Sequence, residues 1–193
     1  MKTKPMRGIS LVEVMVAIGI LAILVSVALP SFTDLIARRR LQAVTAEIAS
    51  DLAYARSEAA LRPQGTLVLF RQNTSTTCYT IQSGSGTINC DCTRGVGNAC
   101  PTSVLGASPE LKTMQLARTT GITVTPSATN WATANNKLGF QSPQLLPTSP
   151  DFGVTISNSN ASLRVEFNSI GRVSTCSPNG SFGGGVRTCL VQQ

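Results

Sequence analysis

The chain opens with a short basic leader and continues into a long apolar run. Residues 9–32 are apolar or uncharged at every position except Glu13, and the leader before them, residues 1–8, holds three basic side chains. At the rise of an α-helix these 24 residues extend about 36 Å, which is enough to cross a bilayer. The pattern therefore predicts a membrane-spanning helix at 9–32, with the basic leader in the cytoplasm.

A helical pattern continues beyond the apolar run, now with one polar face. Between residues 33 and 62 apolar side chains recur every three or four positions, as on one face of a helix. They are Leu41, Val44, Ile48, Leu52, Ala55 and Ala59. Pro30 is expected to kink the long helix, and Pro63 is expected to end it. Glu47 and Asp51 lie one turn apart and off the apolar stripe, so we expect both to be solvated.

After the helix, the pattern changes to short runs of β-type residues. Alternation of apolar and polar side chains is clearest in 163–167, and such runs predict strands. The predicted strands cover 66–71, 77–82, 121–125, 152–157, 162–167, 171–175 and 186–191. Loops rich in Gly, Ser, Thr, Asn and Pro separate them at 83–109, 126–136 and 141–150. One long helix followed by strands predicts an α+β fold, in which an antiparallel sheet of a globular domain, residues 63–193, covers the helix stripe.

Composition narrows the chemistry that the chain can perform. It has no histidine, which removes the most common general base and the commonest metal ligand. The glycines at 183–185 are not followed by the Lys-Ser/Thr of a phosphate-binding loop. We therefore expect no enzyme activity, no metal and no cofactor.

The cysteines indicate an oxidising compartment. All six lie downstream of Gln64 and none forms a Cys-x-x-Cys motif, so disulfides are favoured over zinc. Cys176 and Cys189 flank one Gly-rich loop and are the pair that the sequence favours most.

The other four cysteines leave several pairings open. Cys90 and Cys92 are only two positions apart, so each is expected to bond to a cysteine elsewhere. We predict the pairs Cys78–Cys90 and Cys92–Cys100.

Glu13 needs an explanation, because a charge in an apolar membrane segment costs a few kcal/mol and is usually functional. If the chain is cut after Gly8, Ile9 gains a free amine that is positive at neutral pH. Glu13 lies four residues further on, so this amine or that of a neighbouring chain could neutralise it. An ordinary signal anchor containing a Glu is one alternative. A cleaved secretory signal is another, although residues 27–30, Val-Ala-Leu-Pro, offer no good small-residue cleavage site.

This arrangement closely resembles the class III signal peptide of type IV pilins and type II secretion pseudopilins. Gly8, Ile9 and Glu13 match the three defining positions, and Pro30 falls where that family places a helix-kinking proline. The resemblance implies that prepilin peptidase cuts after Gly8 and methylates Ile9, and that Glu13 pairs with the amine of an adjacent subunit. It also implies that the subunit is held in the inner membrane, with its domain in the periplasm, and then joins other pilins in an extracytoplasmic filament.

The end of the helix narrows the resemblance to the GspH/FimT group of minor pilins and pseudopilins. Residues 51–59, Asp-Leu-Ala-Tyr-Ala-Arg-Ser-Glu-Ala, are similar to the helix-end pattern of that group, and 167–172, Phe-Asn-Ser-Ile-Gly-Arg, to a later one. Many secretion-type members have Trp and Gly after the first strand, where this chain has Cys78 and Tyr79, which favours a type IV pilus over a secretion pseudopilus. The resemblance implies a minor subunit that helps to prime assembly at or near the filament tip.

A basic excess in the globular part suggests an alternative function. Residues 63–193 hold eight Lys and Arg against four acidic side chains, which could favour a polyanion. Some FimT-like pilins bind DNA during natural transformation, so a DNA-binding pilus receptor is the alternative. The residues that could contact phosphates are Arg94, Arg164, Arg172 and Arg187. Solvated arginines are the competing interpretation, because aromatic side chains for stacking are few and the Gly-Arg-x-Arg tail of several pilus-type members is absent after Leu190.

Overall fold

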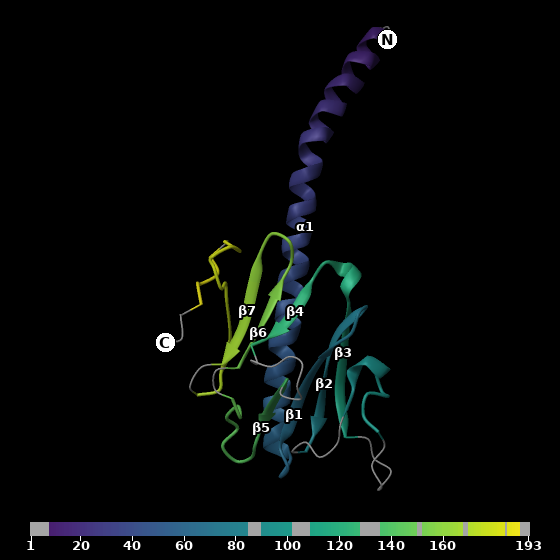
Figure 1. Ribbon diagram of the computed structural model, residues 1–193. Coiled ribbons are helices and arrows are strands. Elements are labelled where there is room, and N and C mark those ends of the chain that lie inside the picture. Colours follow the sequence, from purple (N-terminus) through teal and green to yellow (C-terminus); the bar gives the residue numbers. More distant parts are fainter. Residues whose placement is uncertain are drawn as a thin grey trace, which may run out of the picture. The chain divides into compact units, whose positions relative to one another are not determined.

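The computed structural model describes residues 8–84, 90–101, 109–127, 136–149, 152–167, 170–183 and 185–189, apart from the side chains of 27–31. Among these residues, one long helix precedes all the strands, and two short 3-10 helices lie between them (Figure 1). The elements are α1 (Leu11–Leu61), β1 (Thr66–Gln72), β2 (Thr76–Ser83), η1 (Cys92–Arg94), β3 (Glu110–Ala117), η2 (Arg118–Thr120), β4 (Thr123–Pro126), β5 (Lys137–Phe140), β6 (Gly153–Ser157), β7 (Ser162–Phe167) and β8 (Val173–Cys176). The predicted α+β class is confirmed.

Within the described residues the strands form two antiparallel sheets of four strands each. The first sheet has the order β3-β2-β1-β5 and the second has the order β4-β6-β7-β8. The sequence did not predict β3, whose edge position leaves most of its side chains partly or fully exposed, or β5, which is only four residues long. The strand predicted at 186–191 is wrong for its described part. That part makes only a single bridge, from Thr188 to Ser177.

The chain divides into two compact units, residues 1–39 and residues 40–193. In the first unit, every described side chain from Gly8 to Ser26 is exposed. Among the described residues, no helix combines the length and the apolar character that a membrane crossing requires. The membrane span at 9–32 therefore stays a prediction.

In the second unit, the predicted apolar stripe of the helix is confirmed as the centre of the core. Its members, Leu41, Val44, Ile48, Leu52, Ala55 and Ala59, are all buried. They form one cluster with inward-facing side chains of both sheets, such as Phe70 and Phe140 from the first and Val154 and Val165 from the second. Each large apolar side chain buried in this way contributes about 1.5–3 kcal/mol, so the helix and the two sheets depend on one another.

Strand β1 is buried on both of its faces. Alternate residues of a strand point to opposite sides of the sheet, and Val68 and Phe70 belong to the helix-facing core. Leu67 and Leu69 point to the other side, where they pack with Cys90 and Cys100 in a second, smaller cluster. The segment 90–100, which we call the disulfide cap, therefore covers the outer face of the first sheet.

The disulfides of this cap correct the predicted pairing. The structure joins Cys78 to Cys92 and Cys90 to Cys100, so the predicted pairs Cys78–Cys90 and Cys92–Cys100 are wrong. Cys90 and Cys100 both lie in the apolar cluster on the outer face of β1, which brings them together, and Cys92 is left to reach β2. The spacing of Cys90 and Cys92 correctly predicted that they do not bond to each other. It did not indicate how the cap folds back onto the sheet, and this fold decides the pairing.

Glu110 holds the disulfide cap closed from the start of β3. One of its carboxylate oxygens accepts hydrogen bonds from the amide of Gly97 at 2.8 Å and the hydroxyl of Thr113 at 2.6 Å, and the other from the amide of Ala99 at 3.0 Å. Partial burial alone would raise the pKa of Glu110, but these hydrogen bonds outweigh it and lower the pKa below its usual value of 4.5. The charged form of Glu110 is therefore the one that stabilises the cap.

Asp51 is buried, which corrects the expectation that it is solvated. It is only 4% exposed, and its carboxylate accepts hydrogen bonds from the hydroxyl of Tyr79 at 2.7 Å and from Nζ of Lys112 at 2.6 Å. Burial and the hydrogen bond to this carboxylate raise the pKa of Tyr79 well above its usual range, so the phenol stays a donor. Asp51 thus ties the helix to β2 and β3 at once. Its neighbour Glu47 is exposed, as expected.

We expect Asp51→Ala to lower the free energy of unfolding by about 2 kcal/mol or more, because it leaves the buried Tyr79 hydroxyl without its acceptor and removes the ion pair with Lys112. Urea unfolding at pH 7 measures the effect. Glu47→Ala is the matched control, since this exposed carboxylate lies one turn away, and it is expected to change stability by less than about 0.5 kcal/mol. Equal stability of the Asp51 variant and the wild type would contradict the assignment.

We expect Glu110→Gln to destabilise the protein at pH 7 by about 1 kcal/mol, because an amide cannot accept all the hydrogen bonds of the carboxylate. Since the folded-state pKa of Glu110 is lowered, the charged carboxylate stabilises the fold above its unfolded pKa, and this contribution is lost as the pH falls through the folded pKa. The difference between variant and wild type should therefore shrink in acid. Urea unfolding of both proteins at pH 7 and pH 3 tests this, and a difference that does not change with pH would argue against the role.

Candidate processing and assembly site

The predicted processing residues lie just before the helix. Gly8, Ile9 and Ser10 precede α1, and the amide of Val14 donates to the carbonyl of Ser10 at 3.2 Å, which starts the helical pattern. Glu13 lies in the first turn, where a carboxylate interacts favourably with the helix dipole by about 0.3–1 kcal/mol. The helix start thus offers Glu13 a modest local stabilisation.

The surroundings of Glu13 are apolar and open. Ile9, one turn before it, is 77% exposed, and Ala17, one turn after it, is exposed as well. Within the described part of the chain, no hydrogen bond or ion pair involves the Glu13 carboxylate. An exposed apolar surface of this kind marks an interaction with a membrane or with another protein. A single charge inside such a contact requires a partner of opposite sign, because an unpaired buried charge costs several kcal/mol.

Gly8 is not required by the local structure of the chain. It is not among the glycines with positive φ, and a Cβ placed on it meets no atom within 4 Å. A larger residue would therefore fit in the described structure. If glycine is needed at this position, the need arises from a partner that receives the segment.

The structure leaves the role of Pro30 as a prediction. Its backbone lies inside α1, within Leu11–Leu61. The proline removes one helical hydrogen bond, which is why a kink is expected.

The structure separates the arginines proposed to contact DNA. Arg94 belongs to η1 in the disulfide cap on the first sheet, whereas Arg164, Arg172 and Arg187 lie in or beside the second sheet. The guanidinium of Arg187 forms an ion pair with Glu166 at 2.9 Å. Arg164 is half-buried, and its guanidinium lies so close above Gly153 that a Cβ there would collide with it. DNA binding by these four residues stays a prediction.

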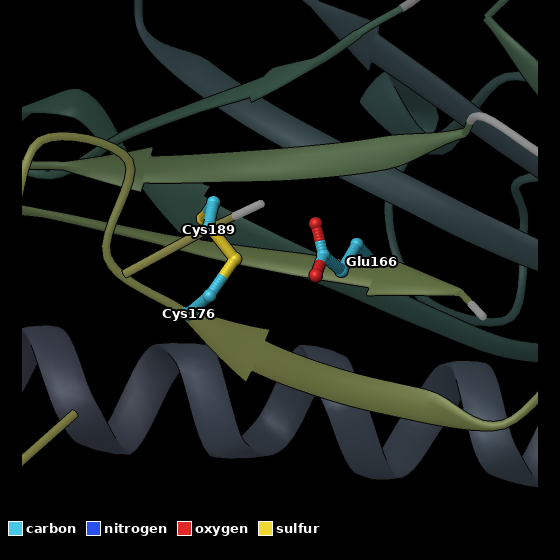
Figure 2. A group of neighbouring side chains, drawn as sticks. All are labelled: Glu166, Cys176 and Cys189. Atoms are coloured by element: carbon cyan, nitrogen blue, oxygen red, sulfur yellow. A yellow bond between two sulfur atoms is a disulfide. The ribbon is translucent and has the colours of Figure 1, made fainter. Parts of the chain in front are cut away.

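Glu166 also lies beside the disulfide Cys176–Cys189, the pair that the sequence favoured (Figure 2). The carboxylate oxygen and the two sulfurs lie within 4.8 Å of one another, which is close enough for a metal site by distance alone. However, the sulfurs are bonded to each other and offer no thiolate, and Glu166 is paired with Arg187. This group therefore closes the C-terminal segment onto the second sheet.

Sequence reasoning missed two helix residues that organise the second unit, Asp51 and Arg56. Arg56 donates from Nε to the carbonyl of Leu145 at 3.0 Å and from Nη2 to the carbonyl of Ile170 at 3.2 Å. Both residues lie in the helix-end segment 51–59, whose resemblance to a family pattern was noted without a role for either side chain. The position of Asp51 off the apolar stripe suggested solvent contact, although polar side chains at the edge of a stripe can also reach a covering sheet.

Among the comparisons with known proteins, one gave a match, and it covers the start of the chain. Residues 3–29 match the family model of the prokaryotic N-terminal methylation motif, and this range includes Gly8, Ile9 and Glu13. Comparisons with curated proteins and with solved structures gave no match. The chain therefore carries the N-terminal hallmark of type IV pilins and pseudopilins, on an α+β fold that is consistent with theirs.

Proposed function

We propose that this chain is a minor subunit of a type IV pilus, of the GspH/FimT kind. In this proposal prepilin peptidase cuts after Gly8 and methylates Ile9. The subunit is first held in the inner membrane by residues 9–32 and then enters an extracytoplasmic filament with other pilins. There it helps to prime assembly at or near the tip.

The observation that carries the proposal is the lone carboxylate of Glu13 in an exposed apolar helix. Packing this helix among similar helices buries the apolar side chains, which are otherwise exposed. It also places Glu13 in a low-dielectric setting, where the methylated amine of a neighbouring Ile9 can neutralise it. Short side chains at Ala17, Gly19 and Ala22 permit the close approach of helices, and a Cβ on Gly19 meets no atom of its own chain.

The globular unit supports an extracytoplasmic filament. All six cysteines are paired, which suits an oxidising compartment. The first sheet carries Cys78 and Tyr79 where many secretion-type members have Trp and Gly. In this chain Tyr79 donates to Asp51, and Cys78 anchors the disulfide cap. These features favour the pilus over the secretion pseudopilus.

We expect Gly8→Phe to block removal of the leader while leaving the fold unchanged, because a side chain at this position fits in the isolated chain. A gel of membrane fractions should show a retained leader on the variant. Gly19→Ala is the matched control, since it adds a side chain at an equally open glycine outside the cleavage junction, and it should be processed normally. Normal processing of the Gly8 variant would show that the peptidase does not read this position.

We expect deletion of the gene to cause a strong loss of surface pili, and wild-type protein to restore them. Glu13→Ala should remain in the membrane and fail to restore pili, because the pairing with an amine is lost. Pili in sheared surface fractions are the measurement, with Glu47→Ala, an exposed carboxylate of the second unit, as the control that restores them.

Two outcomes would contradict this proposal. Restoration by the Glu13 variant would reject the pairing. Normal pili in the deletion strain would reject priming of a pilus and favour the secretion pseudopilus, or the alternative DNA receptor, whose binding would fall steeply with salt.

A further inference from the structure

The second unit contains a groove that the proposed function does not use. One wall is the solvent-facing side of α1, with Ala53, Arg56 and Ser57. The other walls are Leu145, in the loop after β5, and residues 171–173, where β8 begins. Its volume is about 450 Å³, which is within the size range of sites that hold a small ligand or a few side chains.

Arg56 fixes the shape of this groove. Its guanidinium donates to the carbonyls of Leu145 and Ile170 at 3.0 and 3.2 Å. One helix residue therefore holds both the loop after β5 and the segment before β8. Gly171 is left-handed, with φ of 72°, so a residue with a side chain would be strained here. The groove is therefore built from fixed backbone, as a preformed binding surface requires.

Leu145 is held in an unfavourable backbone conformation beside the groove. Its φ of 54° is in the left-handed region, which a residue with a Cβ rarely adopts. Its amide donates to the carbonyl of Gln141 at 2.8 Å, and its carbonyl accepts from Arg56. Strained backbone conformations of this kind concentrate at ligand clamps and other functional sites. The conformation of Leu145 therefore supports a binding role for the groove.

The chemistry of the groove combines apolar rims with positive charge. Leu146 and Ile170, next to the walls, are large apolar side chains that are 42% and 66% exposed. Arg56 and Arg172 are the charged residues of the lining, and the described lining contains no acidic side chain. A guanidinium binds a carboxylate in a strong, directional way. The groove is thus complementary to a carboxylate that lies beside an apolar side chain.

We propose that this groove receives an extended segment of a neighbouring pilin-like subunit, which presents a carboxylate to Arg172 and an apolar side chain to Leu145 and its neighbours. This rests on the proposed function, because a filament supplies such a neighbour. The helix face that leads into the groove also suits a protein backbone, because its exposed residues are short and a partner chain can approach closely. These residues are Ala46, Ser50, Ala53 and Ser57.

Photocross-linking in the native filament tests the proposal. The full chain carries benzoylphenylalanine in place of Ser57, and the cross-linked peptide is identified by mass spectrometry. The control carries the same group in place of Val96, which is exposed in the disulfide cap and outside the groove. We expect Ser57 to yield an adduct with an acidic segment of a second subunit that has an N-terminal methylation motif, and Val96 to give no such adduct.

Arginine variants test the chemistry of the same contact. Arg172→Glu should lower the cross-linking yield roughly tenfold, because a carboxylate in the partner is then repelled, whereas Arg172→Lys should retain most of it. Equal urea unfolding midpoints of the two variants exclude a loss of fold. An adduct that persists in Arg172→Glu, or one with a protein that lacks the motif, would overturn the proposal.

The filament fraction separates this proposal from the proposed function. If the subunit is present in sheared filaments and Ser57 gives no adduct, the groove proposal fails and the filament role stands. If the subunit is absent from filaments in every variant and in the wild type, the proposed function itself fails.

Discussion

Both sheets of the second unit bury their inner faces on the same apolar stripe of α1, from Leu41 to Ala59. An apolar helix face loses stability if it stays in water, and the same holds for the apolar inner face of each sheet. Burial of this shared surface therefore holds three layers together. Apolar packing alone does not fix how the helix is positioned along the strands. Asp51 fixes it, because Tyr79 and Lys112 can both donate to its carboxylate only in one register of helix and strands.

The outer face of the first sheet also carries apolar side chains, and these are covered in a different way. Here the disulfide cap, a segment closed by its own disulfide and containing only the short 3-10 helix η1, covers Leu67 and Leu69. Such a short segment cannot bury enough surface to order itself, because fixing each residue costs about 1–2 kcal/mol of conformational entropy. The two disulfides reduce the entropy of the unfolded chain, and Glu110 then satisfies the amides of Gly97 and Ala99. Covalent closure and charge here supplement a small apolar cluster.

Local patterns decided how much of this the sequence could predict. The helix stripe, the strands β1, β2, β6 and β7, and the pair Cys176–Cys189 depend on spacing along the chain, and each was predicted close to its place. What failed depends on contacts between distant residues. The burial of Asp51 needs Tyr79 and Lys112, the pairing of Cys90 needs the outer face of β1, and the span of Arg56 needs two loops that lie 89 and 114 residues further along. No pattern in a single segment carries that information. The helix-start residues Gly8 and Glu13 could be singled out for the opposite reason, since they belong to a local pattern, which the family model also matches over residues 3–29.

Each of the two units contains a carboxylate in apolar surroundings, Glu13 in the first and Asp51 in the second, and the same physical rule applies to both. At the start of α1, Glu13 is a charge without a partner among the described residues of its own chain, set in exposed apolar surface. In the second unit, Asp51 is a charge that the chain itself satisfies with a phenol and an ammonium. A buried carboxylate is stable only when donors meet it, so the difference between these residues lies in where the donors come from. For Asp51 they come from the fold. For Glu13 the described residues supply none, so burying that carboxylate requires a donor from outside them.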